Sequence, residues 1–369
     1  MKKCSKQFSR ILAIILSLTV LFISTGTTAL AATNDDSNVI KYDYVQTLPD
    51  GGKIYTYIID GVENNFPVPP KGFKPLMATD EELATYGFPP RPTDPKELEA
   101  WTQNMAAYKT TPIPEVIKSD VVHGVMIPDN SLKSMKTSPN FIGTVNSQTS
   151  SNWSGYMATG GKNAFAQVQG DFVQPTIQSG CINNTAESTW VGLGGSGSGK
   201  PLVQTGTAMN TINGARKYYA WYEYLSPAHP NPEIKFTKVT IRPGDRIHCY
   251  CSFQRSNNKF NAYVANNTNG TSQSVIVNIS AAEYYDGTTA EFINERPTLS
   301  NGQSSWYAPL TKYGTTNWTN CQVYKTTSTW TNLASLPHTD IIMTNNGRTL
   351  ATPSGLSGKN FKSTWNNYN

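Results

Sequence analysis

The chain has 369 residues and a formal net charge of +5. Its longest apolar run, near the N-terminus, is shorter than the roughly 20 residues of a membrane-spanning helix, which argues against an integral membrane protein. About 230 residues follow the N-terminal third of the chain, enough for one substantial core.

Residues 1–32 have the pattern of a secretory signal peptide. Four basic residues lie among the first ten, an apolar run extends from 11 to about 23, and small residues fill 27–32. We therefore expect a secreted, extracellular protein whose mature chain begins near Ala32 or Thr33. Cys4 would be removed with the signal.

Two regions of opposite charge follow. Residues 33–139 carry 15 acidic against 10 basic side chains, and residues 140–369 carry 10 against 16. One interpretation is two separately solvated regions. The other is that 33–139 is a propeptide that covers the basic part as an intramolecular inhibitor, held partly by its carboxylates.

The propeptide region contains two helix starts. Thr79 and Glu82 form a capping-box pattern, and Asp94-Pro95 places proline at a first helical position, followed by Trp101 and Met105 on one face. The prolines between and after these segments favour an extended chain that lies on a partner surface.

Residues 140–369 have the period of β-strands. Ile247, Cys249, Cys251 and Phe253 alternate with more polar residues, and similar runs follow between turn signals such as Pro243-Gly244-Asp245. Because no helices intervene for parallel crossovers, we predict one antiparallel β-sandwich of two sheets. The last strand is expected at 340–343.

Four cysteines remain after signal removal, namely Cys181, Cys249, Cys251 and Cys321. An even number in an exported protein predicts one or two disulfides, although Cys249 and Cys251 point the same way on one strand. Together with His229 and His248 these cysteines do not have metal-ligand spacing, and we expect neither a metal nor another cofactor.

The usual hydrolytic motifs are missing from the sequence. There is no Gly-x-Ser-x-Gly elbow, no His-Glu-x-x-His and no Asp-Thr/Ser-Gly pair. Glu223, Glu291 and Glu295 instead occur in strands of bulky residues, where a carboxylate must be paired or line a cleft. Gln204 lies in similar surroundings.

These residues resemble the glutamic peptidases called eqolisins, in particular their bacterial members. Seven motifs occur in the family's order, at 152–155, 168–175, 190–192, 202–206, 220–223, 243–245 and 290–297. The prosegment motif at 86–92 is also similar to that of bacterial members.

The resemblance implies a metal-independent acid endopeptidase on a concanavalin-like sandwich. Its catalytic pair would be Gln204 and Glu295, with Glu295 favoured over Glu291. Glu295 would activate water as a general base, and Gln204 would stabilise the oxyanion. Trp190, Trp221, Glu223 and Glu291 would line or support the cleft.

Three positions depart from the fungal pattern of this family. Gly194 and Tyr219 stand where aspartates occur, and Leu225 replaces an aromatic residue. These departures leave the substrate preference of the cleft open, while the pair itself is intact.

Two other functions fit a sandwich. In a retaining glycanase the two carboxyl groups lie about 5 to 5.5 Å apart, whereas four strand residues span roughly 13 Å. A carbohydrate-binding module could use Trp153, Trp306, Tyr307 and Trp318 as stacking platforms. We expect a monomer that acts on proteins or peptides, with no nucleic-acid or membrane partner.

Overall fold

The computed structural model describes residues 39–124, 126–127, 147–196, 201–212, 214–229, 232–280, 283, 285–300, 304–326 and 329–369. The predicted signal peptide and the predicted boundary between residues 139 and 140 lie outside these ranges. Within them, no helix is both long enough and apolar enough to cross a membrane.

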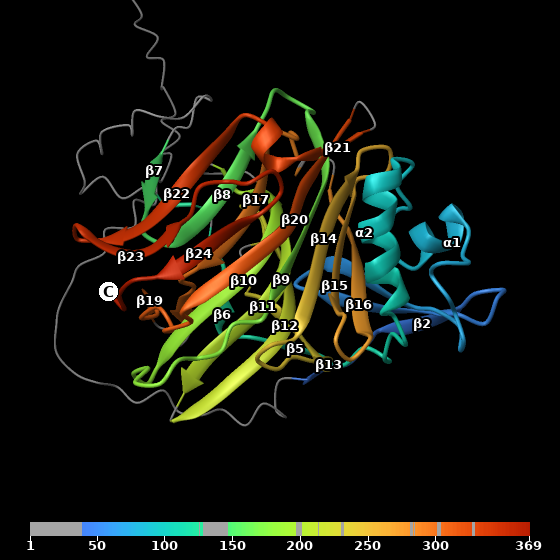
Figure 1. Ribbon diagram of the computed structural model, residues 1–369. Coiled ribbons are helices and arrows are strands. Elements are labelled where there is room, and N and C mark those ends of the chain that lie inside the picture. The colour runs from blue at the N-terminus through green and yellow to red at the C-terminus, as the bar shows by residue number, and fades with distance from the viewer. Residues whose placement is uncertain are drawn as a thin grey trace, which may run out of the picture. The chain divides into compact units, whose positions relative to one another are not determined.

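The predicted β-sandwich is confirmed. Nearly all strand pairs are antiparallel, and the strands fold over into two packed layers (Figure 1). In spatial order, the first layer contains β13 (Ile234–Thr240), β12 (Ala215–Leu225), β11 (Leu202–Ile212), β10 (Thr185–Gly194), β17 (Thr289–Glu295), β8 (Trp153–Thr159) and β22 (His338–Asn345).

The second layer carries the alternating strands on which the sequence prediction was based. It contains β20 (Thr315–Lys325), β9 (Phe165–Val173), β14 (Arg246–Gln254), β15 (Lys259–Asn266) and β16 (Thr271–Asn278). The remaining elements of this part are β7 (Gln148–Ser150), β18 (Thr298–Ser300), β19 (Ser305–Tyr307), β21 (Thr329–Asn332), the 3-10 turn η3 (Leu333–Ser335), β23 (Arg348–Pro353) and β24 (Phe361–Trp365).

The main core lies between the two layers. Val191, Val203 and Phe292 of the first layer share one buried cluster with Cys251 and Val264 of the second. Every second residue of β10, β11 and β17 points into this core, so the residues between them point to the outer face of the first layer.

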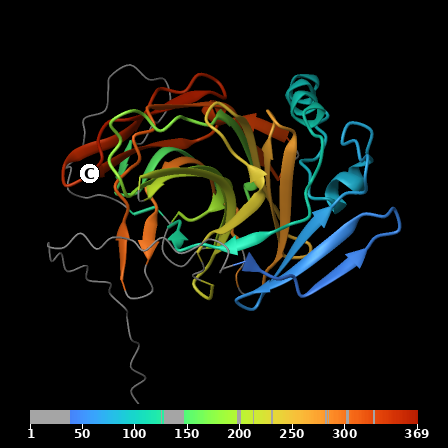
Figure 2. The same cartoon turned by 90° about the horizontal axis from the view of Figure 1, so that it is seen from below.

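The segment from 39 to 127, called the prosegment below, adds strands to both layers. It contains β1 (Val39–Ile40), β2 (Tyr44–Thr47), β3 (Lys53–Ile59), β4 (Val62–Val68), α1 (Asp80–Thr85), α2 (Pro95–Ala106), β5 (Val116–Lys118) and β6 (Val121–Val122). Strand β4 pairs with β16, β5 with β13, and β6 with β18 (Figure 2). The prosegment therefore covers edge strands that would otherwise expose unpaired backbone groups.

Both predicted helix starts are confirmed. The side chain of Thr79 accepts from the Glu82 amide at 3.2 Å, and the Glu82 carboxylate accepts from the Thr79 amide at 2.7 Å. Asp94 caps α2, with Pro95 in its first turn. The predicted inner face of α2, Trp101 and Met105, is buried against the outer side of β14 and β15 (Figure 1).

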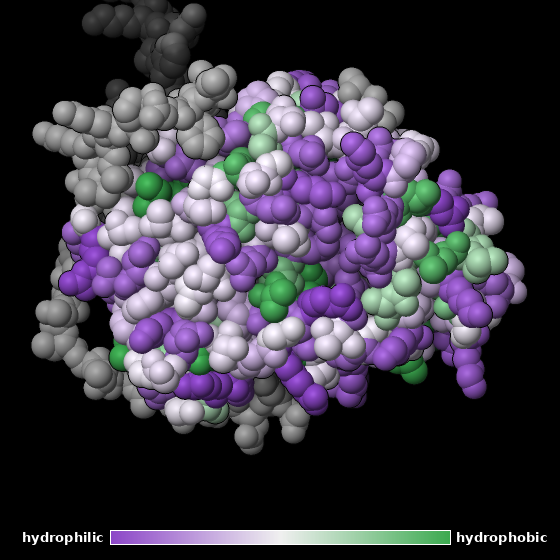
Figure 3. Space-filling model, viewed as in Figure 1, coloured by the Kyte–Doolittle hydropathy of each residue, from purple (hydrophilic) through white to green (hydrophobic). Residues whose placement is uncertain are grey.

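Apolar contacts and strand pairing make up most of this docking. Among described residues, ion pairs between the prosegment and the sandwich join Glu97 to Lys359 at 3.6 Å and Glu115 to Lys238 at 2.9 Å, and the buried His123 ring lies between Glu233 and Glu295. Asp80 instead pairs with Arg91 inside the prosegment. The face of the molecule in Figure 3 is mostly hydrophilic, with small separate apolar spots.

Two expectations are wrong. Cys181, Cys249, Cys251 and Cys321 are all free, so the described part of the chain has no disulfide. Residues 340–343 belong to β22, which is followed by β23 and β24. The alternation of residues within a strand shows neither which cysteines pair nor how many strands follow, because both depend on contacts between distant segments.

Candidate active site

Four neighbouring strands of the first layer carry the predicted site residues. The strand register places Gln204 of β11 opposite Glu223 of β12 on one side and Gly192 of β10 on the other. Gly192 in turn lies opposite Glu291 of β17. These four residues thus form one row across the sheet.

The row lies on the outer face of the layer. Trp190, Trp221 and Ile293, which alternate with the core-facing residues, form a separate buried cluster on that face with Trp153. The indoles of Trp153 and Trp190 meet edge to face, 5.0 Å between ring centroids. Aromatic walls therefore flank the polar row.

Gly192 lies at the centre of the row, beneath the Trp190 ring. A Cβ atom at this position would lie 2.8 Å from that ring and 3.1 Å from the Val203 carbonyl oxygen, so the close approach of the indole requires glycine. The strand register places Gln204 and Glu291 on either side of Gly192. Their Cα atoms are then about 10 Å apart, twice the spacing of neighbouring strands.

Gln204 and Glu291 both carry polar atoms without partners. Both side chains are fully buried. Gln204 Nε2 donates to Glu223 Oε2 at 2.5 Å, but Gln204 Oε1 has no hydrogen bond within the described chain. The Thr289 side chain and the Gly194 amide approach the Glu291 carboxylate, but neither of its oxygens has a partner at full hydrogen-bond geometry among the described residues. Buried polar atoms in this state usually mark a water or ligand site.

Burial also changes the proton affinity of these carboxyl groups. It raises the pKa of Glu291 well above its ordinary value; the nearby Thr289 side chain and Gly194 amide oppose this shift only in part. Burial likewise raises the pKa of Glu223, although His123 opposes it. Both carboxyl groups favour the protonated form in this closed state of the molecule.

Glu295 has a different environment. Its Oε2 accepts from Trp190 Nε1 at 2.8 Å and lies 3.0 Å from His123 Nδ1, while Oε1 accepts from the Gly124 amide at 3.0 Å. Both oxygens of Glu295 are thus occupied, and two of the three partners belong to the prosegment.

The register favours Glu291 over Glu295 as the partner of Gln204. Glu295 lies opposite Ser188, four residues along β10 from Gly192. Two strands across and four residues along place the Gln204 and Glu295 Cα atoms roughly 16 Å apart. The predicted pairing of Gln204 with Glu295 stays a prediction, because Glu223 holds Gln204 and His123 in turn bridges Glu223 and Glu295.

His123 is a site residue that sequence reasoning missed. Its ring is fully buried and stacks on Trp221 with centroids 3.7 Å apart and planes 11° apart. Nε2 lies 2.7 Å from Glu233 Oε2, and the His123 amide donates to Glu223 Oε1 at 3.1 Å. Burial alone would lower the pKa of His123, but the Glu295 charge and the bonds to Glu233 and Glu295 raise it to about 10.

The departures at Gly194 and Tyr219 have local explanations. Gly194 has φ 101°, and a Cβ there would lie 2.1 Å from the Pro201 carbonyl oxygen, so this backbone requires glycine. Tyr219 donates its hydroxyl to Glu233 Oε1 at 2.7 Å. Leu225 packs against the outer cluster.

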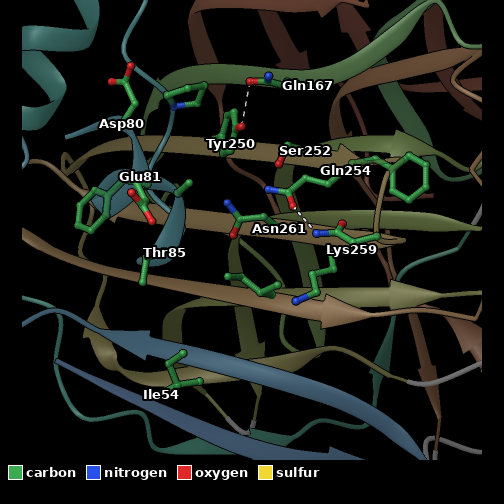
Figure 4. A pocket seen from close by; sticks show the side chains of 16 residues that line it. Ile54, Asp80, Glu81, Thr85, Gln167, Tyr250, Ser252, Gln254, Lys259 and Asn261 are labelled. Atoms are coloured by element: carbon green, nitrogen blue, oxygen red, sulfur yellow. Dashed lines mark hydrogen bonds between the residues drawn. The ribbon is translucent and has the colours of Figure 1, made fainter. Parts of the chain in front are cut away.

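A pocket of about 480 Å³ lies elsewhere, between the prosegment and the second layer. Asp80, Glu81 and Thr85 of α1 face Tyr250 and Asn261 across it (Figure 4). Gln204, Glu291 and Glu295 do not line it. On the first layer, His123 and Gly124 instead contact Glu223 and Glu295.

The proposed stacking platforms for a carbohydrate are mostly unsuitable. Trp153 and Trp318 are buried, and Trp318 stacks on Phe361 inside the core. The Tyr307 ring carries the Arg296 guanidinium, 4.8 Å from its centroid. These residues therefore do not form a row of exposed aromatic rings.

The fold and the row together define a β-sandwich with a buried glutamine, a buried glutamate and aromatic walls. The family model described as the Peptidase A4 family matches residues 151–365, more than half of the chain. This chain therefore belongs to the Peptidase A4 family, whose members include the eqolisins that the motifs resemble.

Known relatives agree with this membership. Aspergillopepsin-2 from Aspergillus niger is 28% identical over 123 residues, 28% of this chain and 42% of that protein. The chain thus matches about two-fifths of the length of this curated relative.

Two solved structures are similar to parts of this chain. Scytalido-glutamic peptidase, solved with a transition state analog inhibitor, has a TM-score of 0.51 and 24% identity over 58% of this chain and 98% of that one. Aspergilloglutamic peptidase from Aspergillus niger has a TM-score of 0.42 and 25% identity, covering 49% and 99% of the two chains. The first likeness supports the sandwich fold.

Proposed function

We propose that this protein is a glutamic endopeptidase in which Gln204 and Glu291 act as the catalytic pair. The observation that carries the proposal is the row across Gly192. There, the Gln204 carbonyl oxygen and both Glu291 oxygens are buried without hydrogen-bond partners in the described chain. Membership of the Peptidase A4 family supports the reaction class.

In the proposed reaction, a water molecule binds between the two side chains. Ionised Glu291 takes a proton from this water, whose oxygen attacks the carbonyl carbon of the substrate. The Nε2 proton of Gln204 that is not bonded to Glu223 stabilises the oxyanion. The C–N bond then breaks as Glu291 returns the proton to the leaving amine.

Glu223 has a positioning role in this proposal. Its Oε2 accepts from Gln204 Nε2 at 2.5 Å and so fixes the orientation of the amide. With one N–H held in this way, the other N–H points away from Glu223 and is available to the oxyanion. Trp190 and Trp221 enclose the reacting groups and limit the access of bulk water.

The proposal includes latency. His123 and Gly124 occupy the Glu295 end of the cleft, and burial raises the pKa of the Glu291 carboxyl, which disfavours the ionised form that acts as the base. Removal of the prosegment would admit water and bring the pKa of Glu291 toward the ordinary value near 4.3.

We further infer that the chain is exported before this activation. The inference rests on the pattern of residues 1–32, and fractionation of a producing culture would test it. An intracellular product with residues 1–32 intact would contradict it.

Acidification of the purified full chain to about pH 3 to 4 tests the function. The expected result is self-shortening followed by digestion of a denatured protein, with neither step in a Glu291→Gln, Gln204→Ala double variant. Pepstatin, chelators, and serine and thiol reagents should leave the activity unchanged. Hydrolysis of a β-glucan but not of protein would instead support the glycanase.

A further inference from the structure

The pocket that holds His123 has a carboxylate at each ring nitrogen. Nδ1 lies 3.0 Å from Glu295 Oε2, and Nε2 lies 2.7 Å from Glu233 Oε2. An imidazole between two acceptors satisfies both only when both nitrogens carry protons. The pocket therefore fits an imidazolium cation, and the raised pKa of His123 agrees with this.

The other walls of the pocket fit a flat ring. The imidazole lies almost parallel to Trp221, at a centroid distance of 3.7 Å, and has no exposed surface. A cation stacked on an indole face gains both dispersion and electrostatic attraction. A lysine side chain offers no flat face that could stack on Trp221.

All of these walls belong to the sandwich. Trp221 and Tyr219 lie on β12, Glu295 ends β17, and Glu233 directly precedes β13. The Tyr219 hydroxyl donates to Glu233 Oε1 at 2.7 Å and so directs Oε2 toward the ring. The pocket should therefore remain after the prosegment has left.

The prosegment binds beside this pocket through its backbone. The Ser119 amide donates to the Glu233 carbonyl, and the Glu233 amide donates to the Val121 carbonyl, both at 3.0 Å. Strand β6 then pairs with β18 on the other side. An extended peptide that adds a strand to an open edge is recognised in the same way, with side-chain pockets providing specificity.

We propose that Glu233, Tyr219 and Trp221 form a substrate subsite that selects a histidine side chain. The inference rests on the proposed peptidase function and names a substrate preference for it. His123 then occupies the subsite intramolecularly until a histidine of a substrate replaces it. Glu233 is the residue that determines the preference.

The test begins with the acid-activated full chain and a mixed peptide digest near pH 4, where histidine is charged. Mass spectrometry should show histidine enriched at one fixed position relative to the cleaved bond. Two peptides that differ only by His or Phe at that position then give a ratio of kcat/KM. We expect wild type to favour His by roughly 10- to 100-fold, as for a hydrogen bond to a charged group.

Variants assign the effect to the subsite. Glu233→Gln should bring the His:Phe ratio close to 1, and Tyr219→Phe should lower it less. Asp171→Asn, which alters a histidine–carboxylate pair between β9 and β14, is the matched control and should keep the wild-type ratio. If Glu233→Gln does not fold, Tyr219→Phe decides.

Three results would overturn the subsite. The first is cleavage without histidine enrichment, and the second is a His:Phe ratio at or below 1 in wild type. The third is a ratio that neither folded variant changes. In each case the proposed peptidase function would stand, whereas the absence of any cleavage by wild type would overturn that function and the subsite with it.

Discussion

Two glutamates on one strand differ in almost every property that matters for chemistry. Glu295 is bonded by Trp190, His123 and Gly124. Glu291, four residues earlier on the same face of β17, has two buried oxygens without a described partner. Both oxygens of Glu295 are thus bonded, two of their partners being residues of the prosegment, whereas Glu291 is the residue that we propose as the base.

The difference between the two glutamates suggests separate roles for the two ends of β17. A buried carboxyl without partners costs free energy, which other contacts of the fold must offset. Gln204 faces this costly end of β17 across Gly192, while His123 fills the other end. Catalysis and inhibition would then occupy neighbouring but separate parts of one cleft.

The largest expected effect separates the two glutamates. Glu291→Gln removes the proposed base, so peptide hydrolysis should fall by about 10²- to 10⁴-fold or more. Glu295→Gln keeps an acceptor for Trp190 and should retain more activity than Glu291→Gln. Initial rates of acid-activated proteins on one peptide measure both. Loss in Glu295→Gln with full activity in Glu291→Gln would reinstate Glu295 as the base.

The next effect concerns the amide opposite Glu291. Gln204→Ala removes the proposed oxyanion donor, and kcat should fall by roughly 10²- to 10³-fold. Gln273→Ala, which removes a buried amide from β16 in the other layer, is the matched control. Equal losses in the two variants, with equal loss of thermal stability, would mean that the amide of Gln204 serves only the fold.

Local patterns predicted much of this molecule from the sequence. Alternation gave the sandwich, and the caps at Thr79 and Asp94 gave both helices, because each depends on residues close in the chain. The motif order also led to Gln204. These patterns involve residues close in the chain, and they predicted the features of the fold that depend on such residues.

The choice between Glu291 and Glu295 is not local. Both lie on one face because a strand repeats every two residues, so alternation cannot separate them. The register of β17 on β10 and of β10 on β11 decides which of them faces Gln204. Register depends on loops and on packing of distant strands, which a single sequence does not show.

His123 was missed for a related reason. It lies 172 residues from Glu295 in the chain and 110 from Glu233. The histidines that the sequence offered for a site, His229 and His248, lie in the predicted sandwich, whereas His123 belongs to the prosegment. A useful signal was available in the short run Val121-Val122-His123-Gly124, a small apolar strand ending in the one histidine of the prosegment.

A smaller effect is expected at the Glu295 end. His123→Phe keeps a flat ring on Trp221 but removes both bonds to carboxylates, so the prosegment should hold the cleft less tightly. We expect activation at a given mildly acidic pH to be about tenfold faster, as for the loss of one or two charged hydrogen bonds. His338→Phe, a histidine of β22 away from the cleft, is the control. Unchanged activation of His123→Phe would show that apolar docking alone maintains latency.

The smallest expected effect is the loss of folding stability at alkaline pH, when the His123 ring loses its charge. The pKa of His123 is raised from 6.5 to about 10, so the ring contributes stability that is fully present below pH 6.5 and lost as the pH rises through 10. The melting temperature of the full chain should therefore decline by a few degrees more between pH 7 and 10 in wild type than in His123→Asn. Glu291, whose raised pKa has no contribution from His123, affects both proteins alike and cancels in the difference. Glu223 reduces the difference, because His123 opposes the rise of its pKa in wild type only. Parallel declines would contradict a charged His123 and would weaken the contrast between the two ends of β17.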